Sequence, residues 1–307
     1  MTKTRARRGI RSDMSRALVR RETTSAYIFL IPSLFFFVGF VIIPMVMCVR
    51  TSFFDSTLSA NTADTFIGFA NYKEIFGDPI FRKAMVNTLI IVVVSVPVVT
   101  AFSLWVGSAI YKLKGPVLST FRCIFYLPVV TGSVAVTVVW RWMFNQYYGI
   151  FNYLLKGTGV IDQNINWLGD PRFALWCIIL ILITTSVGQP IVLYVSALGN
   201  VDATLIEAAK VDGATNRQVF WQIQWSQIMP TTLYVLVITT INSFQCFALI
   251  QLLTSGGPNY ATETVMYYIY YSAFKLYRFG YGNAMGVILA ICIAVISAIQ
   301  FWLARER

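Results

Sequence analysis

The segment between two long apolar runs, residues 201–230, carries polar and small residues whose spacing predicts a short helix, a turn and a second helix. Thr204 and Glu207 have the spacing of a capping box, which predicts that a short helix begins here. Ala208 and Ala209 favour a helix and present a small, flat face. We therefore predict a surface helix with a carboxylate and two small residues near its start.

The second half of this segment predicts a turn and a return to the apolar part of the chain. Gly213 can adopt a positive φ and reverse the chain direction. Val219, Phe220 and Ile223 supply the apolar face of a second helix. Asp202 can cap the start of the first helix. The expected product is a helix–turn–helix knuckle at about residues 201–227.

Polar but uncharged side chains form a second candidate set, inside the two apolar runs that flank the knuckle. Thr239, Asn242, Ser243 and Cys246 are spaced so that they share one helix face. Such groups suit a hydroxyl-rich solute better than an ion, although they can also join helices by hydrogen bonds. The candidate residues for a solute path are Thr185, Gln189, Thr239, Asn242, Ser243 and Gln245.

The chain lacks most of the side chains that catalysis, metal binding or ion coupling would require. It contains no His, and its apolar runs contain no Asp or Glu, so we expect no catalytic residue and no metal site. It has no Gly-Lys dipeptide and hence no phosphate-binding loop. Its five Cys lie in or beside apolar runs without a CxxC pair, which indicates buried thiols.

Composition places these candidates in a membrane protein. Of the 307 residues, 57% are hydrophobic and only 12% are charged, whereas a soluble domain carries about 25% charged residues. A membrane-spanning helix needs ~20 mostly apolar residues. Residues 264–274 are too short to span and should form an interfacial or re-entrant segment. Six spans are predicted, at Ala26–Val49, Ala84–Tyr111, Cys123–Trp140, Phe173–Val201, Ile228–Leu253 and Asn283–Ala304.

The distribution of basic residues predicts the orientation. The net charge is +11, and eight of the 24 Lys and Arg residues lie within residues 1–21. With the N-terminus inside, the inner segments hold 15 basic residues and the outer loops hold 7. We expect both termini and the knuckle in the cytoplasm, with the basic tail, residues 1–25, facing anionic membrane lipid rather than nucleic acid.

The amino-acid sequence of the knuckle resembles the EAA loop of ABC importer permeases. Glu207-Ala208-Ala209, then Asp212-Gly213-Ala214, and Ile223 at the family spacing carry the likeness. A second match is Leu253-Thr254-Ser255-Gly256-Gly257-Pro258, followed by a tyrosine-rich segment. Together these motifs resemble the carbohydrate branch, the permeases of maltose or glycerol phosphate type.

This resemblance implies an all-α, six-helix permease of the type I ABC importer fold, with a transmembrane domain at residues 26–304 and a cytoplasmic C-terminus at 305–307. It implies import of a carbohydrate across the bacterial plasma membrane by alternating access. The implied partners are a second homologous permease, two copies of a cytoplasmic ATPase that binds ATP and Mg²⁺, and an extracellular solute-binding protein. The chain itself would bind no cofactor. The implied coupling residues are Glu207, Ala208, Ala209, Asp212, Gly213 and Ala214.

Three other functions remain to be compared with this one. The same machinery could carry a polyol or a glycerol phosphate. An ion-coupled carrier or channel would work without a nucleotide partner, and it leaves the knuckle unexplained. An intramembrane enzyme would need catalytic side chains that the spans do not contain.

Overall fold

The fold was analysed in a computed structural model that describes residue 23 and residues 25–57 and 64–305. The basic tail predicted at residues 1–25 lies almost wholly outside the described residues, as do residues 306 and 307. Within the described part the chain is helical apart from loops and a two-stranded antiparallel hairpin of β1 (Phe54–Asp55) and β2 (Thr65–Phe66).

Five helices in the described part of the chain are long and apolar enough to cross a membrane, and a bent helix pair makes a sixth crossing if it counts as one span. The all-α membrane fold is therefore confirmed. Two of them are Ser25–Thr51, which includes η1 (Val38–Ile42) and α2 (Ile43–Thr51), and α4 (Pro79–Ile110). Two more are built from several elements: α8 (Ala174–Ser186) is continued by α9 (Gly188–Gly199), and α11 (Asn216–Gln218) is continued by η2 (Val219–Gln224), α12 (Trp225–Phe244) and α13 (Ala248–Leu253). The last is α15 (Phe279–Arg305).

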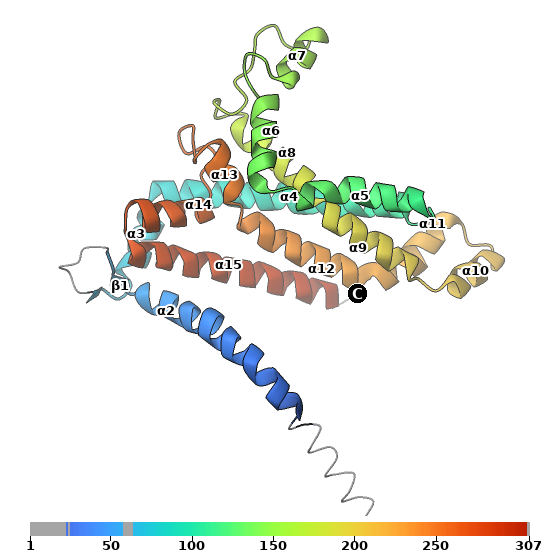
Figure 1. The fold of residues 1–307 in the computed structure, drawn as a ribbon, viewed down its shortest axis with the longest axis horizontal. Coiled ribbons are helices and arrows are strands. Elements are labelled where there is room, and N and C mark those ends of the chain that lie inside the picture. Colours follow the sequence, from blue (N-terminus) through green and yellow to red (C-terminus); the bar gives the residue numbers. More distant parts are fainter. Residues whose placement is uncertain (1–22, 24, 58–63, 306–307) are drawn as a thin grey trace, which may run out of the picture.

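The long helices pack side by side, so that the bundle has two distinct ends (Figure 1). One end carries α10 (Ala203–Val211) and α11, and the other carries α3 (Ala70–Gly77), α13 and α14 (Val265–Tyr270). Val99 of α4 and Ile191 and Val195 of α9 are buried in one core cluster. Because lipid tails are as apolar as these side chains, van der Waals contact in the packed cluster, and not removal from water, stabilises this arrangement.

The third predicted span is wrong as a single helix. In its place α5 (Pro116–Val130) and α6 (Ser133–Met143) meet at 94°. Thr131 and Gly132 have extended ψ values of 126° and 143°, so the helix cannot pass through them. Beyond the bend, α6 and the short helix α7 (Ile150–Gly157) project away from the bundle (Figure 1).

Other boundaries also differ from the prediction: α4 begins at Pro79 rather than Ala84, and α15 begins at Phe279 rather than Asn283. The fifth span begins at Asn216 rather than Ile228, because the second helix of the knuckle runs on into the bundle without a break. The predicted interfacial segment forms α14 and a π-helical turn, η3 (Tyr271–Lys275). It is too short to span, as expected, but it is packed against α4 and α15 rather than spread on the surface: Val265 is fully buried.

The first helix, Ser25–Thr51, stands apart from the rest of the bundle (Figure 1). None of the residues in its most apolar stretch is buried against the described chain. Its last turns contact α15, where the Cys48 thiol lies 3.5 Å from the Asn283 amide oxygen. The helix is therefore held at one end only.

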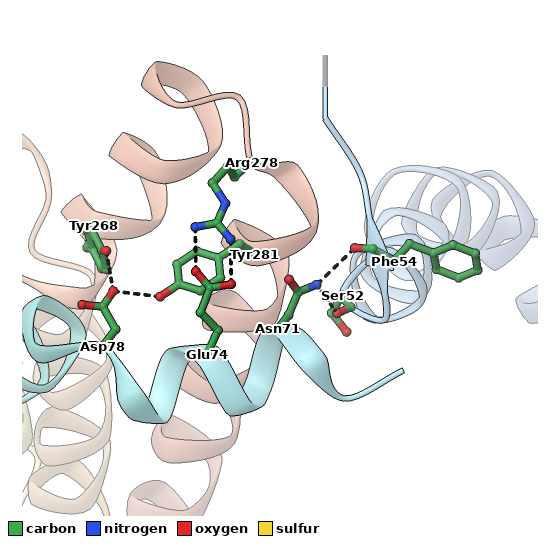
Figure 2. Close-up of polar contacts among 8 residues, drawn as sticks. All are labelled: Ser52, Phe54, Asn71, Glu74, Asp78, Tyr268, Arg278 and Tyr281. Carbon is green, nitrogen blue, oxygen red and sulfur yellow. Dashed lines mark hydrogen bonds and ion pairs between the residues drawn. The ribbon is translucent and has the colours of Figure 1, made fainter. Parts of the chain in front are cut away.

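A polar network ties the α3 end of the bundle together (Figure 2). Asp78, the N-cap of α4, accepts hydrogen bonds from the hydroxyls of Tyr268 and Tyr281, the latter at 2.8 Å. Arg278 forms a two-pronged ion pair with Glu74 at 2.7 and 2.8 Å. These contacts join α3 and α4 to the C-terminal helices, which are about 200 residues away along the chain.

The environment of Asp78 sets how this network responds to pH. Burial alone would raise the pKa of this carboxyl, but hydrogen bonds from the two tyrosines and from the backbone N–H groups of Ile80 and Phe81 lower it overall. A lowered folded pKa gives stability that is present above the ordinary aspartate pKa of about 3.9 and is lost as the pH falls through the lower folded value.

Removing one hydroxyl donor should weaken this end of the bundle. Tyr281→Phe leaves Asp78 with one tyrosine partner, and a hydrogen bond to a charged group is worth about 1.5–3 kcal/mol. We expect the lower end of that range because Asp78 is only partly buried. Thermal unfolding of the purified protein in nanodiscs should show a lower Tm at pH 7, and the difference should shrink below pH 4. Tyr153→Phe, at an exposed site, is the control, and equal Tm values for both variants would contradict the prediction.

At one point α5 and α9 approach too closely for any side chain. A Cβ placed on Gly188, the first residue of α9, would lie 2.2 Å from the backbone oxygen of Phe125 and 2.8 Å from a methyl group of Val129. Because a backbone oxygen cannot rotate away, only glycine fits unless the two helices separate.

Gly188→Ala should therefore destabilise the bundle by about 1–3 kcal/mol, the usual cost of overpacking. Gly286→Ala in α15 is the matched control, since a Cβ there meets nothing within 4 Å and alanine is the better helix former. Denaturation of both variants in the same lipid would test this. A Gly188→Ala protein as stable as the Gly286→Ala protein would show that the close approach is not a constraint.

Candidate solute cavity and coupling loop

Three helix interruptions meet around one cavity of about 480 Å³. They are the α5–α6 bend, the break between α8 and α9, and the break between α12 and α13. Because the helices stop there, polar side chains and backbone groups become available to a bound molecule. The polar lining residues are Thr131, Ser133, Thr185, Asn242 and Gln245, with the Cys246 thiol beside them.

A smaller cavity of about 130 Å³ continues from the first, and Thr185 and Asn242 line both. It adds Gln189 from α9 and Thr239 from α12. Five of the six residues predicted for a solute path therefore line these two adjoining cavities. No lining residue of either cavity is Asp, Glu, Lys or Arg.

Ser243 is the exception among the predicted path residues. It is buried on the other side of α12, and its hydroxyl lies 2.9 Å from the hydroxyl of Ser95 in α4. The structure thus places Ser243 in a helix–helix contact and not with the other five. Residues three or four positions apart on a helix differ by 40–60° in direction around its axis. This difference is enough for one of them to face another helix, so the predicted shared face does not include Ser243.

The amide side chains around the cavity are free to bind a guest. Gln189, Asn242 and Gln245 are exposed, and within the described chain no hydrogen bond engages their side chains. Thr185 donates to the carbonyl of Ile181, which leaves its oxygen able to accept. Thr131 and Ser133 were not predicted to line the cavity. Pro128 and Gly132, which stand inside an apolar run, were the signal that a helix is interrupted there.

The knuckle forms as expected, but with different caps. Asp202 caps α10: its carboxylate accepts from the Thr204 backbone N–H at 2.9 Å and from the Thr204 hydroxyl at 2.8 Å. The predicted capping box of Thr204 and Glu207 is therefore wrong, because the Thr204 hydroxyl is already used within the first turn. The capping box lies instead at Thr215 and Gln218, where it begins the second helix.

The turn of the knuckle is a Schellman motif. Gly213 has a φ of +82°. Its N–H donates to Lys210 at 3.1 Å, and the N–H of Ala214 donates to Ala209 at 2.9 Å, which is the paired pattern of that motif. Glycine is favoured at this position because other residues rarely adopt a positive φ.

The predicted coupling residues form the outer surface of this knuckle. Glu207, Ala208, Asp212 and Gly213 are exposed, whereas Ala209 and Ala214 are half-buried. Within the described chain Glu207 has no ion pair or side-chain hydrogen bond. An exposed carboxylate without a partner beside two small residues is available to another protein.

Two helices connect the knuckle directly to the cavity. Gln189, at the cavity, is the second residue of α9, which ends at Gly199 just before the knuckle, about 15 Å away at 1.5 Å per residue. On the other side α12 runs from the knuckle to Asn242, about 26 Å along its axis. Buried Tyr194 and Leu198 of α9 pack with Ile228 and Val235 of α12. Two helices packed on each other therefore join the knuckle to the cavity.

Comparison with known proteins supports this arrangement. Residues 78–306 match the family described as "Binding-protein-dependent transport system inner membrane component". The chain is 32% identical to the probable ABC transporter permease protein YesP of Bacillus subtilis (strain 168), over 92% of this chain and 91% of that protein. It is 29% identical to the lactose transport system permease protein LacF of Rhizobium radiobacter, over 95% and 97% of the two chains.

The fold is also similar to a chain in the crystal structure of a bacterial ABC transporter involved in the import of the acidic polysaccharide alginate. The TM-score is 0.76 at 22% identity, with 93% of this chain and 96% of that chain covered. At this identity the likeness concerns the fold alone. The family match covers most of the chain and includes the knuckle and both sides of the cavity. The chain belongs to the family of inner membrane components of binding-protein-dependent transport systems.

Proposed function

We propose that this chain is the permease subunit of an ATP-driven importer that moves a carbohydrate delivered by an extracellular solute-binding protein. The observation that carries the proposal is the cavity of uncharged amides and hydroxyls, joined through α9 and α12 to a surface knuckle. Hydroxyl-rich solutes match such a lining, because each hydroxyl can both donate and accept.

The lining also separates this proposal from its alternatives. A glycerol phosphate would bring a charge that proteins usually bind with Arg or Lys, and neither lines the cavity. An ion-coupled carrier usually places a carboxylate near its solute, and no Asp or Glu lines the cavity. A neutral sugar or oligosaccharide therefore fits better than either, with a neutral polyol as the second candidate. Among relatives with a named solute, the lactose of LacF agrees with this chemistry, whereas the sn-glycerol-3-phosphate of UgpA from Agrobacterium fabrum, 27% identical, is a charged solute.

The proposed assembly contains a second homologous permease and two copies of a cytoplasmic ATPase that binds ATP and Mg²⁺. The excess of Lys and Arg in one set of loops supports an orientation with the knuckle and both termini in the cytoplasm. ATP would close the ATPase pair, the knuckle would follow, and α9 and α12 would turn the cavity toward the other side of the membrane. Such coupling requires two conformations of the permease. The ATPase at the knuckle and the solute in the cavity must each bind one of these conformations better than the other.

Glu207→Gln should uncouple ATP hydrolysis from transport. Because Glu207 neither caps α10 nor pairs within the described chain, its charge is available to the ATPase, and leaving a partner charge unpaired costs about 2–5 kcal/mol. We expect at least a tenfold loss of solute-stimulated ATP hydrolysis in the reconstituted complex, with normal membrane insertion. Asp162→Asn, at an exposed carboxylate far from the knuckle in sequence, is the control. Wild-type hydrolysis and transport by the Glu207→Gln complex would refute the coupling role.

Asn242→Ala should weaken solute binding without harming assembly. Loss of a hydrogen bond to a neutral hydroxyl costs about 0.5–1.5 kcal/mol, which raises the half-saturating solute concentration about 2- to 12-fold. The neighbouring Ser243→Ala is the matched control, since Ser243 contacts Ser95 and not the cavity. Uptake by proteoliposomes measures both variants. If Asn242→Ala lowers the yield of assembled complex and Ser243→Ala alters the half-saturating concentration, the roles assigned to the two residues are reversed.

A further inference from the structure

A second cavity, of about 510 Å³, lies at the end of the bundle opposite the knuckle. The loop between α13 and α14, residues 254–264, forms much of its wall. It shares no lining residue with the solute cavity. Its polar lining consists of one carboxyl, Glu263, the side chains of Ser255 and Asn259, and four tyrosines, Tyr260, Tyr267, Tyr268 and Tyr271.

Side chains of α4 hold this loop in place from behind. The Lys83 ammonium donates to the carbonyl of Asn259. The Asn87 amide donates to the carbonyls of Tyr260 and Glu263 at 3.1 and 2.9 Å. The Thr88 hydroxyl accepts from the N–H of Val265 at 3.0 Å. The cavity is therefore preformed, since three residues within six positions of one helix fix the backbone of its wall.

Glu263 is the unexplained group in this cavity. It is only 4% exposed, yet within the described residues nothing donates a hydrogen bond to its carboxyl or pairs with it. Lys83 is bonded to Asn259 instead. Burial raises the pKa of this carboxyl to about 7, which reflects the cost of an unpaired buried charge.

The loop is shaped to admit this carboxyl. A Cβ on Gly256 would lie 1.9 Å from the Glu263 Oε2 atom, so the carboxyl occupies the space that any larger residue would fill. Tyr267 and Tyr268 are buried beside it, while Tyr260 and Tyr271 are 49% and 42% exposed. The buried carboxyl thus lies among buried rings, with half-exposed rings also lining the cavity.

A buried carboxylate among aromatic rings suits one class of ligand. An anion would be repelled, and a neutral hydroxyl would satisfy an oxygen without offsetting its charge. A divalent metal would need several oxygen ligands, whereas the described residues contain no cluster of three metal-binding side chains. An organic cation supplies the opposite charge, N–H donors and attraction to ring faces at once. We propose that this cavity binds an ammonium or guanidinium group.

The proposal is tested with methylguanidinium, and with methylurea as its uncharged isostere at matched ionic strength. The thermal stability of the full chain in nanodiscs should rise saturably with methylguanidinium and stay flat with methylurea. Glu263→Gln should abolish the response, and Asp64→Asn, at an exposed carboxylate, should retain it. Tyr271→Leu, which removes a half-exposed ring, should weaken the response severalfold. This second variant keeps the proposal testable if the Glu263→Gln protein does not fold.

A further binding comparison identifies the source of the cation. A Gly-Arg-Gly amide that binds at least tenfold more tightly than methylguanidinium would indicate a side chain presented by another polypeptide, and equal affinities would indicate a free organic cation. Either result supports the proposal. A wild-type protein with no saturable response to methylguanidinium, an equal response in Glu263→Gln, or a response only to a neutral sugar such as glucose would overturn it.

Discussion

Packing of α9 against both α4 and α12 is the contact on which the rest of this structure depends. Ile191 and Val195 face α4, and Tyr194 and Leu198 pack with Ile228 and Val235 of α12. The fit is close, since a Cβ on Gly107 of α4 would lie 2.8 Å from the Cβ of Tyr194. Because closely packed helices move as rigid units rather than deform, α9 and α12 can carry a displacement from one end to the other.

The cavity exists because the same helices are interrupted, and the interruptions leave polar groups but no charges. Exposed amides cost little while water can reach them, whereas a carboxylate in an apolar bundle would need a partner. This combination matches the hydroxyl-rich solute that we propose for the cavity. The proposed function assigns the supply of energy to a partner that acts on the knuckle.

Sequence patterns predicted the long apolar helices well, because each has a hydrophobic run long enough to cross a membrane. They also placed the knuckle and the positive φ of Gly213. They failed where two side chains could use the same hydroxyl. The Thr204 hydroxyl donates to Asp202 and does not form the predicted capping box with Glu207, whereas Thr215 and Gln218 do form a capping box. The α5–α6 bend was missed because residues 123–140 remain apolar across it.

The candidate site was predictable in part for a related reason. Helical spacing identified a polar face on α12, but it could not show that Ser243 faces Ser95. The cavity around Glu263 could not be predicted at all, since it is built by contacts between α4 and a loop about 175 residues away. Only the tertiary fold reveals that a carboxyl in a polar loop is buried and unpaired.

The most direct test of the account is the side of the membrane from which the solute cavity can be reached. In a variant whose five cysteines are replaced, Gln245→Cys should react with a membrane-impermeant maleimide from one side of the membrane without ATP and from the other side with trapped ATP. Gly213→Cys in the knuckle, which we propose lies in the cytoplasm, is the reference and should never be labelled from outside intact cells. If Gln245→Cys is labelled from the same side in both nucleotide states, the knuckle does not drive the cavity as proposed here.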